Sequence, residues 1–389
     1  MTIRDMDKNT SITWLNLDDR TDCATYEKYW EESEHKRPHD HPGFLELVRP
    51  EHFQPAAVVC QHAEDARIIY PFFHCSVNSF LPFRDVRQSW RHLVSPYGYG
   101  GALFEGKVEH MQAASQAFEC LLDQELKERH FVSEFVREDI FPARLARRAQ
   151  GEVDQQPNVL VKLDRSPDEI WSNYKHAVRS NVNRAMKSGL RVAFDPEGEH
   201  LDSFLDIYYQ TMTRRGAAGS YFFPSERFRQ LAFSLGKRKA TMYAHVYDQD
   251  QIVSSELLLL SHDTIYSFLG GSLASAFAKR PNNLLKHEVI QWGGRNGYKW
   301  LVLGGGLAPG DELFRFKQSF DPDHVVPFTL RRIIHDPNAY RFLEEVRREH
   351  EHRNGRCWLP VPGFFPRYLA PVENQQDEGN EELRRSGPQ

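Results

Sequence analysis

The sequence has few cysteines, no long apolar run and no excess of positive charge. Its five cysteines are an odd number with no Cys-x-x-Cys spacing, which predicts reduced thiols and neither a disulfide framework nor a zinc site. The longest aliphatic run, Leu257 to Leu260, is far shorter than the roughly 20 residues of a membrane span. The N-terminal stretch MTIRDMDKNTS is polar, unlike a signal peptide. A net charge of −5 argues against a protein built mainly to bind DNA. We therefore expect a cytoplasmic protein without a transmembrane segment, a bound metal or a permanently bound cofactor.

The second half of the chain shows the clearest order of elements. At 389 residues, with 40% hydrophobic and 12% aromatic side chains, the chain is large enough for two globular domains. Apolar residues at helical spacing predict one helix from Pro167 to Lys187, which Gly189 ends. The elements expected after it are helices over 201–213 and 225–235, strands over 241–247, 252–260 and 264–270, a helix around 285–292 and a strand over 300–303.

The first half repeats this order. Its expected elements are strands over 56–61 and 67–75, an irregular part ending in SPYGYGG, a helix over 108–128 and a strand over 131–137. Two tandem α/β units explain the repeat better than one large sheet. The polar segment GEVDQQPN is typical of a linker, so we predict domains over residues 10–155 and 156–371. The tail, 372–389, is nearly devoid of apolar residues and is expected to be disordered.

A glycine-rich bend in LVLGGGLAPGDELFRFKQSFDP (301–322) is the most informative feature. The apolar strand ends in Gly304 to Gly306, and three glycines let a backbone bend sharply and a ligand approach it. The pattern then predicts a helix that begins near Asp311 and carries Lys317 among phenylalanines. A lysine in that place is suited to meet an anionic group or an oxyanion. The alternative is a surface helix whose lysine points into water.

Four segments together resemble a known family. They are the glycine-rich bend, YSFLGGSLASAFAKRPNNLLKHEVIQWGGRNGYKW before it, NYKHAVRSNVNRAMKSGLRV (173–192), and SPYGYGG (95–101). The resemblance covers residues 40 to 335 and is to the Fem-type peptidyltransferases and their acyltransferase relatives, in the GNAT acetyltransferase superfamily. It implies an α/β fold of two tandem GNAT-like domains, each with a mixed, mostly antiparallel sheet and flanking helices. It also places Lys317 on the lysine of the family's phenylalanine–lysine pair.

The resemblance implies a donor site in the second domain. Two neighbouring strands would separate between 264–271 and 300–303, and the helix start at KRPNNL would receive phosphates. Candidate donor-binding residues are Gly270, Gly271, Gly304 and Gly305, together with Asn282 or Asn283, whose alternative role is simply to cap the helix. The superfamily's usual glutamine- or arginine-led Gly-x-Gly loop is absent here. The donor therefore stays open between acyl-CoA and aminoacyl-tRNA, either one acting as a co-substrate.

The acceptor side and a general base are predicted from the residues themselves. Tyr97 and Tyr99 offer flat faces and hydroxyls beside Gly98, which suits a sugar or a peptide; the alternative is a turn that packs two aromatics between the domains. Glu256 interrupts IVSSELLLL, where a carboxylate is tolerated if it faces a polar cleft and serves as a base. Its alternative is an ion pair with an arginine across the sheet.

The predicted activity is N-acyl transfer that forms an amide with an amine of a sugar, peptide or small metabolite. Cell-wall Fem enzymes carry a long two-helix arm, and nothing between Asp164 and Leu235 is long enough for one, which weakens a peptidoglycan acceptor but leaves a polysaccharide precursor open. The alternative is a catalytically idle module that binds an acidic sugar or peptide. The basic residues of 166–191 predict either a solvated face or contacts to phosphates of tRNA or of a nucleotide-linked acceptor. HKRPHDH (35–41) predicts a solvated loop in preference to a metal site.

Overall fold

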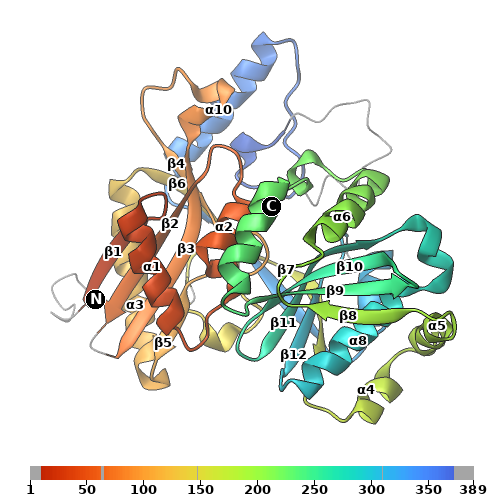
Figure 1. Ribbon diagram of the computed structural model, residues 1–389. Coiled ribbons are helices and arrows are strands. Elements are labelled where there is room, and N and C mark those ends of the chain that lie inside the picture. Colours follow the sequence, from red (N-terminus) through yellow and green to blue (C-terminus); the bar gives the residue numbers. More distant parts are fainter. Residues whose placement is uncertain (1–9, 63–64, 147, 309, 372–389) are drawn as a thin grey trace.

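The chain forms two α/β halves that share one hydrogen-bonded sheet of 13 strands (Figure 1). The computed structural model describes residues 10–62, 65–146, 148–308 and 310–371. Along the sheet the strands follow the order β1-β2-β3-β4-β6-β13-β7-β12-β11-β10-β9-β8, and β5 pairs with β3 off this path. The predicted disordered tail, 372–389, lies outside the described residues.

The N-terminal half has the predicted order of meander, helix and parallel strand. Helix α3 (Val108–Glu128) buries Ala114, Phe118, Leu122 and Leu126, spaced by one turn, against the sheet. β6 (Phe131–Arg137) then pairs in parallel with β4 (Arg91–Val94). The remaining elements of this half are α1 (Arg20–Glu32), α2 (Pro42–Val48), β1 (Thr10–Asn16), β2 (Gln54–His62), β3 (Ala66–Ser76) and β5 (Leu103–Gly106).

The C-terminal half repeats the arrangement. The meander β9 (Thr241–Asp248), β10 (Gln251–Leu260) and β11 (Thr264–Ser272) is antiparallel, and β12 (Trp300–Gly304) pairs in parallel with β11. Helix α8 (Pro281–Arg295) lies between β11 and β12 in the chain. The remaining elements of this half are β7 (Glu152–Lys162), α4 (Pro167–Asn173), α5 (His176–Lys187), β8 (Arg191–Asp195), α6 (Leu201–Arg215), α7 (Ser225–Leu231) and α9 (Glu312–Gln318).

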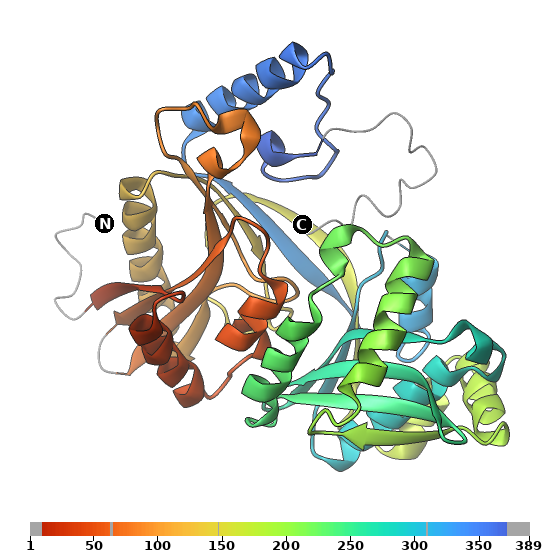
Figure 2. The same cartoon turned by 45° about the horizontal axis from the view of Figure 1, so that its top comes forward.

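Two strands hold the halves together. β13 (Val325–Ile334) pairs with β7 along one edge and with β6 along the other, always antiparallel. In Figure 2 the blue β13 and the yellow β7 run side by side between the halves. Helix α10 (Pro337–Arg353) then packs on the N-terminal half, where Tyr340 and Leu343 join a cluster with Val77, Phe83 and Val132. The two predicted units are therefore present, but hydrogen bonding continues from one into the other.

The prediction of a linker at residues 151–158 is wrong, because these residues begin β7. Their side chains are mostly exposed on both faces of the strand, so no alternation of polar and apolar residues marks them as a strand. Their backbone is nevertheless paired with β13 from Glu152 to Val159. Pro157 lies opposite Pro327, so the two missing N–H donors fall at one place in the ladder. The proposed division at residues 155 and 156 therefore cuts through β7.

The predicted helix over 167–187 is broken into α4 and α5. Tyr174 and Lys175 have extended backbones between them. The Tyr174 side chain is buried against His287 and Phe320, and the Lys175 N–H donates to the Ser319 carbonyl at 2.9 Å. Tertiary contacts thus replace the helical hydrogen bonds that the local sequence would support.

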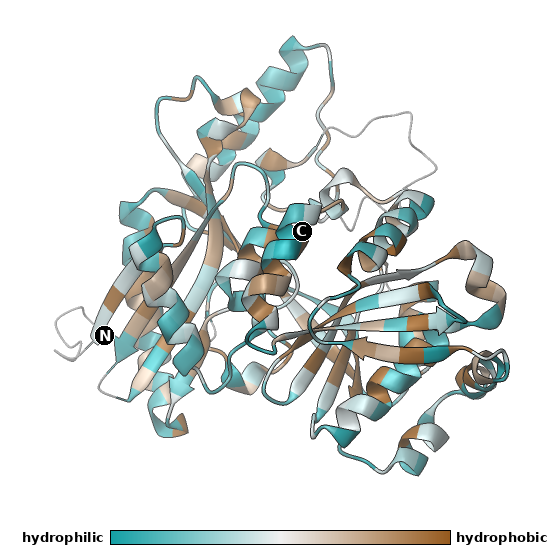
Figure 3. Cartoon of the chain, in the orientation of Figure 1, coloured by the Kyte–Doolittle hydropathy of each residue, from teal (hydrophilic) through white to brown (hydrophobic). Residues whose placement is uncertain are grey.

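Apolar side chains gather on the strands and on the helix faces that meet them, while the outer helix faces are hydrophilic (Figure 3). In the part of the chain that the structure describes, no helix combines the length and hydropathy needed to cross a membrane.

Candidate active site

The strands β11 and β12 separate where the sequence predicts. They pair only from Thr264 to Tyr266 and from Trp300 to Val302. β11 then continues to Ser272 beside β10 alone, whereas Gly304 of β12 pairs with Val159 of β7. Among the described residues no strand pairing joins β11 to β12 past Tyr266, which leaves backbone groups at this edge available to a ligand.

The glycine-rich bend and α9 position Lys317 at the end of β12. Gly304 has a φ of +81°, and the Asp311 carboxylate caps α9 by accepting from the Phe314 N–H. A Cβ on Gly306 would come within 2.2 Å of that carboxylate, so only glycine fits there. The Lys317 Nζ donates to the Gly305 carbonyl at 2.6 Å. Burial, assisted by the charge of Lys286, lowers the pKa of Lys317 to about 8. The predicted water-facing alternative for this lysine is not what the structure shows.

Polar side chains from both halves of the molecule come together around Gly304. A Cβ at this glycine would lie 3.5 Å from the Lys317 Nζ, 3.5 Å from the Tyr99 hydroxyl and 3.9 Å from Asn158 Oδ1. The Tyr99 hydroxyl donates to Asn158 Oδ1 at 2.6 Å. Tyr99 comes from the N-terminal half, Asn158 from β7 and Lys317 from α9, so the predicted acceptor residue and the predicted catalytic lysine are brought together. Sequence reasoning missed Asn158, although it is the polar residue that precedes the apolar run of β7.

Glu256 is paired with a lysine from the covering helix. Its carboxylate is 4% exposed and accepts from the Lys286 ammonium and from the Ser267 hydroxyl, while the Lys286 Nζ also donates to Ser267 Oγ at 2.6 Å. The other carboxylate oxygen, Oε2, is buried without a partner among the described residues. The predicted arginine alternative is therefore wrong. Lys286 was missed, although a charged residue on the buried face of NNLLKHEVI is the signal that could have found it.

The other predicted donor residues have structural contacts of their own. A Cβ on Gly271 would meet Thr211 Oγ1 at 2.1 Å, and one on Gly270 would meet the Ser255 carbonyl at 2.7 Å, so both glycines allow close packing. Capping by Asn282 or Asn283 is wrong, because α8 begins after Arg280 without a side-chain cap and both asparagines lie in its first turn. Asn283 is buried and Asn282 is exposed.

SPYGYGG lies against HKRPHDH between the halves. Tyr97 contacts Tyr221 and Phe268, and a Cβ on Gly98 would come within 2.9 Å of the His39 ring. The prediction that HKRPHDH is a solvated loop is wrong from Arg37 on. Arg37 is buried and donates to Asp40 and to the carbonyls of Gly100 and Gly101. These hydrogen bonds replace the water that its guanidinium loses on burial. Within the described residues no group of three or more His, Cys, Asp or Glu could hold a metal ion.

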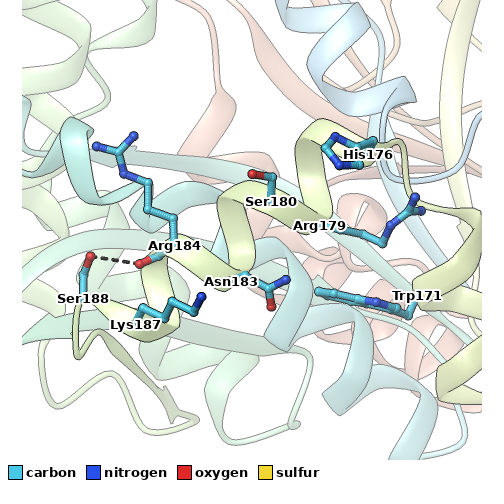
Figure 4. A pocket seen from close by; sticks show the side chains of 8 residues that line it. All are labelled: Trp171, His176, Arg179, Ser180, Asn183, Arg184, Lys187 and Ser188. Atoms are coloured by element: carbon cyan, nitrogen blue, oxygen red, sulfur yellow. Dashed lines mark hydrogen bonds between the residues drawn. The ribbon is translucent and has the colours of Figure 1, made fainter.

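A separate hollow of about 630 Å³ lies along the outer face of α5 (Figure 4). Its basic residues are His176, Arg179, Arg184 and Lys187, and Trp171 adds a flat aromatic face. None of the four has an ion-pair partner among the described residues. The positive charges of Arg179, Arg184 and Lys187 are therefore not balanced by a carboxylate of the described residues.

Comparison with known proteins shows what this chain is similar to. Residues 172–318 match the family model of the acetyltransferase (GNAT) domain. The crystal structure of FemX aligns with 82% of this chain and 97% of its own, with 12% identity and a TM-score of 0.61. A conserved protein of unknown function from Bacteroides thetaiotaomicron aligns with 83% of this chain and 100% of its own, with 12% identity and a TM-score of 0.47. Among curated proteins no match is found. The predicted resemblance is confirmed: residues 172–318 match the GNAT acetyltransferase domain model, and the chain shares the fold of the FemX structure.

Proposed function

We propose that this protein is an N-acyltransferase that joins an activated acyl group to an amine of a sugar, peptide or small metabolite. The observation that carries the proposal is the meeting of Lys317, Tyr99 and Asn158 around Gly304. This point lies beside the edge where β11 and β12 separate, so a donor along that edge and an acceptor at Tyr99 would meet at the lysine. The GNAT domain favours acyl-CoA as the donor.

The reaction needs an attacking amine, a stabilised oxyanion and a route for one proton. The amine nitrogen attacks the acyl carbonyl carbon, and the Lys317 ammonium stabilises the negative charge on its oxygen. The bond from the acyl carbon to the donor's sulfur or oxygen then breaks. Glu256 takes one proton from the amine and passes it to the leaving sulfur or oxygen. The products are an amide and the free thiol or hydroxyl.

A labelling assay tests this function. Purified protein is given radiolabelled acetyl-CoA or radiolabelled aminoacyl-tRNA, each with a cell extract as the source of acceptor. We expect label from acetyl-CoA to reach an amide, and we expect Lys317→Met protein to show none above background. Transfer from aminoacyl-tRNA alone would overturn the choice of donor. Amide from neither donor, together with retention of a ligand from the extract, would favour the idle binding module.

Tyr99→Phe should raise the KM for the acceptor by about tenfold and change saturated turnover by less than that, because it removes one hydroxyl at the acceptor side. The measurement is a steady-state acceptor titration at saturating donor. Tyr174→Phe is the matched control, because its hydroxyl is also buried but bonds to His287 away from Gly304. A change in melting temperature without a change in KM would show that Tyr99 only packs the two halves.

The basic hollow on α5 is proposed to contact phosphates of the donor or acceptor. Arg184→Gln with Lys187→Gln should then weaken binding of the phosphorylated substrate and flatten its salt dependence, because each phosphate contact releases counterions. The measurement is the KM of each substrate across a range of ionic strength. Arg353→Gln with Lys28→Gln, two exposed charges on other helices, is the control. A profile that is already flat in the wild type would remove this role.

A further inference from the structure

Arg137 differs from every other buried arginine in the part of the chain that the structure describes. It is 6% exposed and makes no ion pair with any carboxylate of the described residues. A buried charge that lacks a counter-ion costs free energy, and folded proteins almost always supply one. The other four buried arginines follow this rule: Arg37 pairs with Asp40 and Asp139, Arg148 with Asp123, Arg331 with Glu138 and Arg347 with Glu351.

Arg137 lies at the N-terminal counterpart of the edge where β11 and β12 separate. The parallel pairing of β4 with β6 ends at Val94 and Phe135. Past this point the Ser95 N–H still donates to the Phe135 carbonyl, and an isolated bridge joins Gly100 to Glu138. The loop that bulges out between these points is SPYGYGG. Arg137 therefore lies where β4 and β6 separate, in the same way as β11 and β12 separate in the C-terminal half.

The guanidinium is held in place by Ser95 and Phe135. The Arg137 backbone N–H donates to Ser95 Oγ at 2.8 Å, and its Nη1 donates to the Ser95 carbonyl at 3.3 Å. The group stacks over the Phe135 ring at 4.8 Å. A guanidinium has five N–H donors in a planar fork, and this fork matches the two oxygens of a carboxylate or phosphate. A buried guanidinium that bonds a backbone carbonyl and has no carboxylate partner among the described residues fits an anion receptor better than a structural strut.

The groups nearest the charge are two tyrosines. Tyr97 and Tyr221 are the titratable groups that act on Arg137, and no carboxylate acts on it. Burial lowers the pKa of Arg137 to about 10, so it stays charged at neutral pH. Tyr221 belongs to the turn Gly219–Tyr221, whose neighbours Gly219 and Ser220 are exposed. Tyr221 thus links the environment of the guanidinium to a turn at the surface.

We propose that Arg137 binds an anionic oxygen group, a carboxylate or a phosphate, of the amine acceptor, with the hydroxyls of Tyr97 and Tyr221 beside it. The proposal rests on the proposed function, because Tyr97 is two residues before Tyr99, whose hydroxyl borders Gly304 and Lys317. It narrows the acceptor to molecules that carry both an amine and a negative charge.

A stability comparison is the first test. Arg137→Met removes a buried charge without a counter-ion, so the variant should melt at or above the wild-type temperature when no ligand is present. Arg331→Met is the matched control, because it leaves the buried Glu138 unpaired and should melt lower by roughly 10 °C. If Arg137→Met loses as much as Arg331→Met, Arg137 has a structural role and the proposal is overturned.

Anion binding is the second test, and it needs no transfer reaction. Melting temperatures are measured with sodium acetate, sodium phosphate, sodium chloride at matched ionic strength, and neutral acetamide. We expect acetate or phosphate to raise the wild-type value by several degrees above chloride, acetamide to leave it unchanged, and Arg137→Met to respond to none. Whichever anion acts identifies the group as carboxylate or phosphate. An absent response, or one that persists in Arg137→Met, would overturn the proposal. Because no acyl transfer is measured, a failed labelling assay would not change this result.

Discussion

Lys317→Met should fold normally and transfer its acyl group at least about a hundredfold more slowly, because one oxyanion contact in a preorganised site is worth about 10²–10³ in rate. The ammonium is fixed by the Gly305 carbonyl and lies beside Gly304, at the edge where β11 and β12 part. Phenylalanines on α9 and the surrounding core lower the local dielectric and strengthen its action on a developing charge. The measurement is single-turnover transfer at saturating donor and acceptor.

The pH dependence of turnover gives an independent check on the role of Lys317. Burial lowers the pKa of Lys317 to about 8, so the cationic form is present at neutral pH and is lost as the pH rises through that value. Wild-type turnover should therefore fall on the alkaline side, and Lys317→Arg, which keeps its charge, should move that fall to higher pH. Arg315→Met, on the exposed side of the same helix, is the control and should behave as wild type. Near wild-type turnover in folded Lys317→Met protein would sink the mechanism.

The second large effect concerns the buried pair of Glu256 and Lys286. Glu256→Gln and Lys286→Met should each lower the free energy of unfolding by about 3–5 kcal/mol, because each leaves one buried charge without its partner. The double variant, which buries no charge at this place, should regain most of that stability. Denaturant unfolding of the four proteins measures this cycle.

Measurements of turnover distinguish a role of Glu256 as a general base from a purely structural role as the ion-pair partner of Lys286. If Glu256 accepts the proton of the amine, both Glu256→Gln and the double variant should turn over about 10²–10⁴ times more slowly, even where the double variant is stable. Glu138→Gln is the control, because it leaves the buried Arg331 unpaired without touching Glu256. A double variant that recovers turnover together with stability would show that Glu256 only balances the charge of Lys286.

The local spacing of apolar residues predicted the helices and strands well where each of them buries one face. The helix over 108–128 agrees residue for residue, because its apolar side chains recur once per turn. The separation of β11 and β12 also appears where it was expected. Prediction failed where pairing or burial came from distant residues. β7 was taken for a linker because its polar side chains face water while β13 satisfies its backbone. HKRPHDH was taken for a solvated loop because the carbonyls of Gly100 and Gly101 and the Asp139 carboxylate, which bond Arg37 in the interior, are distant in the sequence.

The sequence by itself determined the helices and strands that bury one side, the bend at Gly304 to Gly306, and the lysine that follows it, since these depend on spacing and backbone freedom within a few residues. Only the tertiary structure decided which groups surround that lysine. Asn158, Lys286 and Arg137 gain their meaning from partners, or from a missing partner, contributed by other strands and helices. The cost of burying a charge depends on what lies across the fold from it, and that information is absent from any short stretch of the chain.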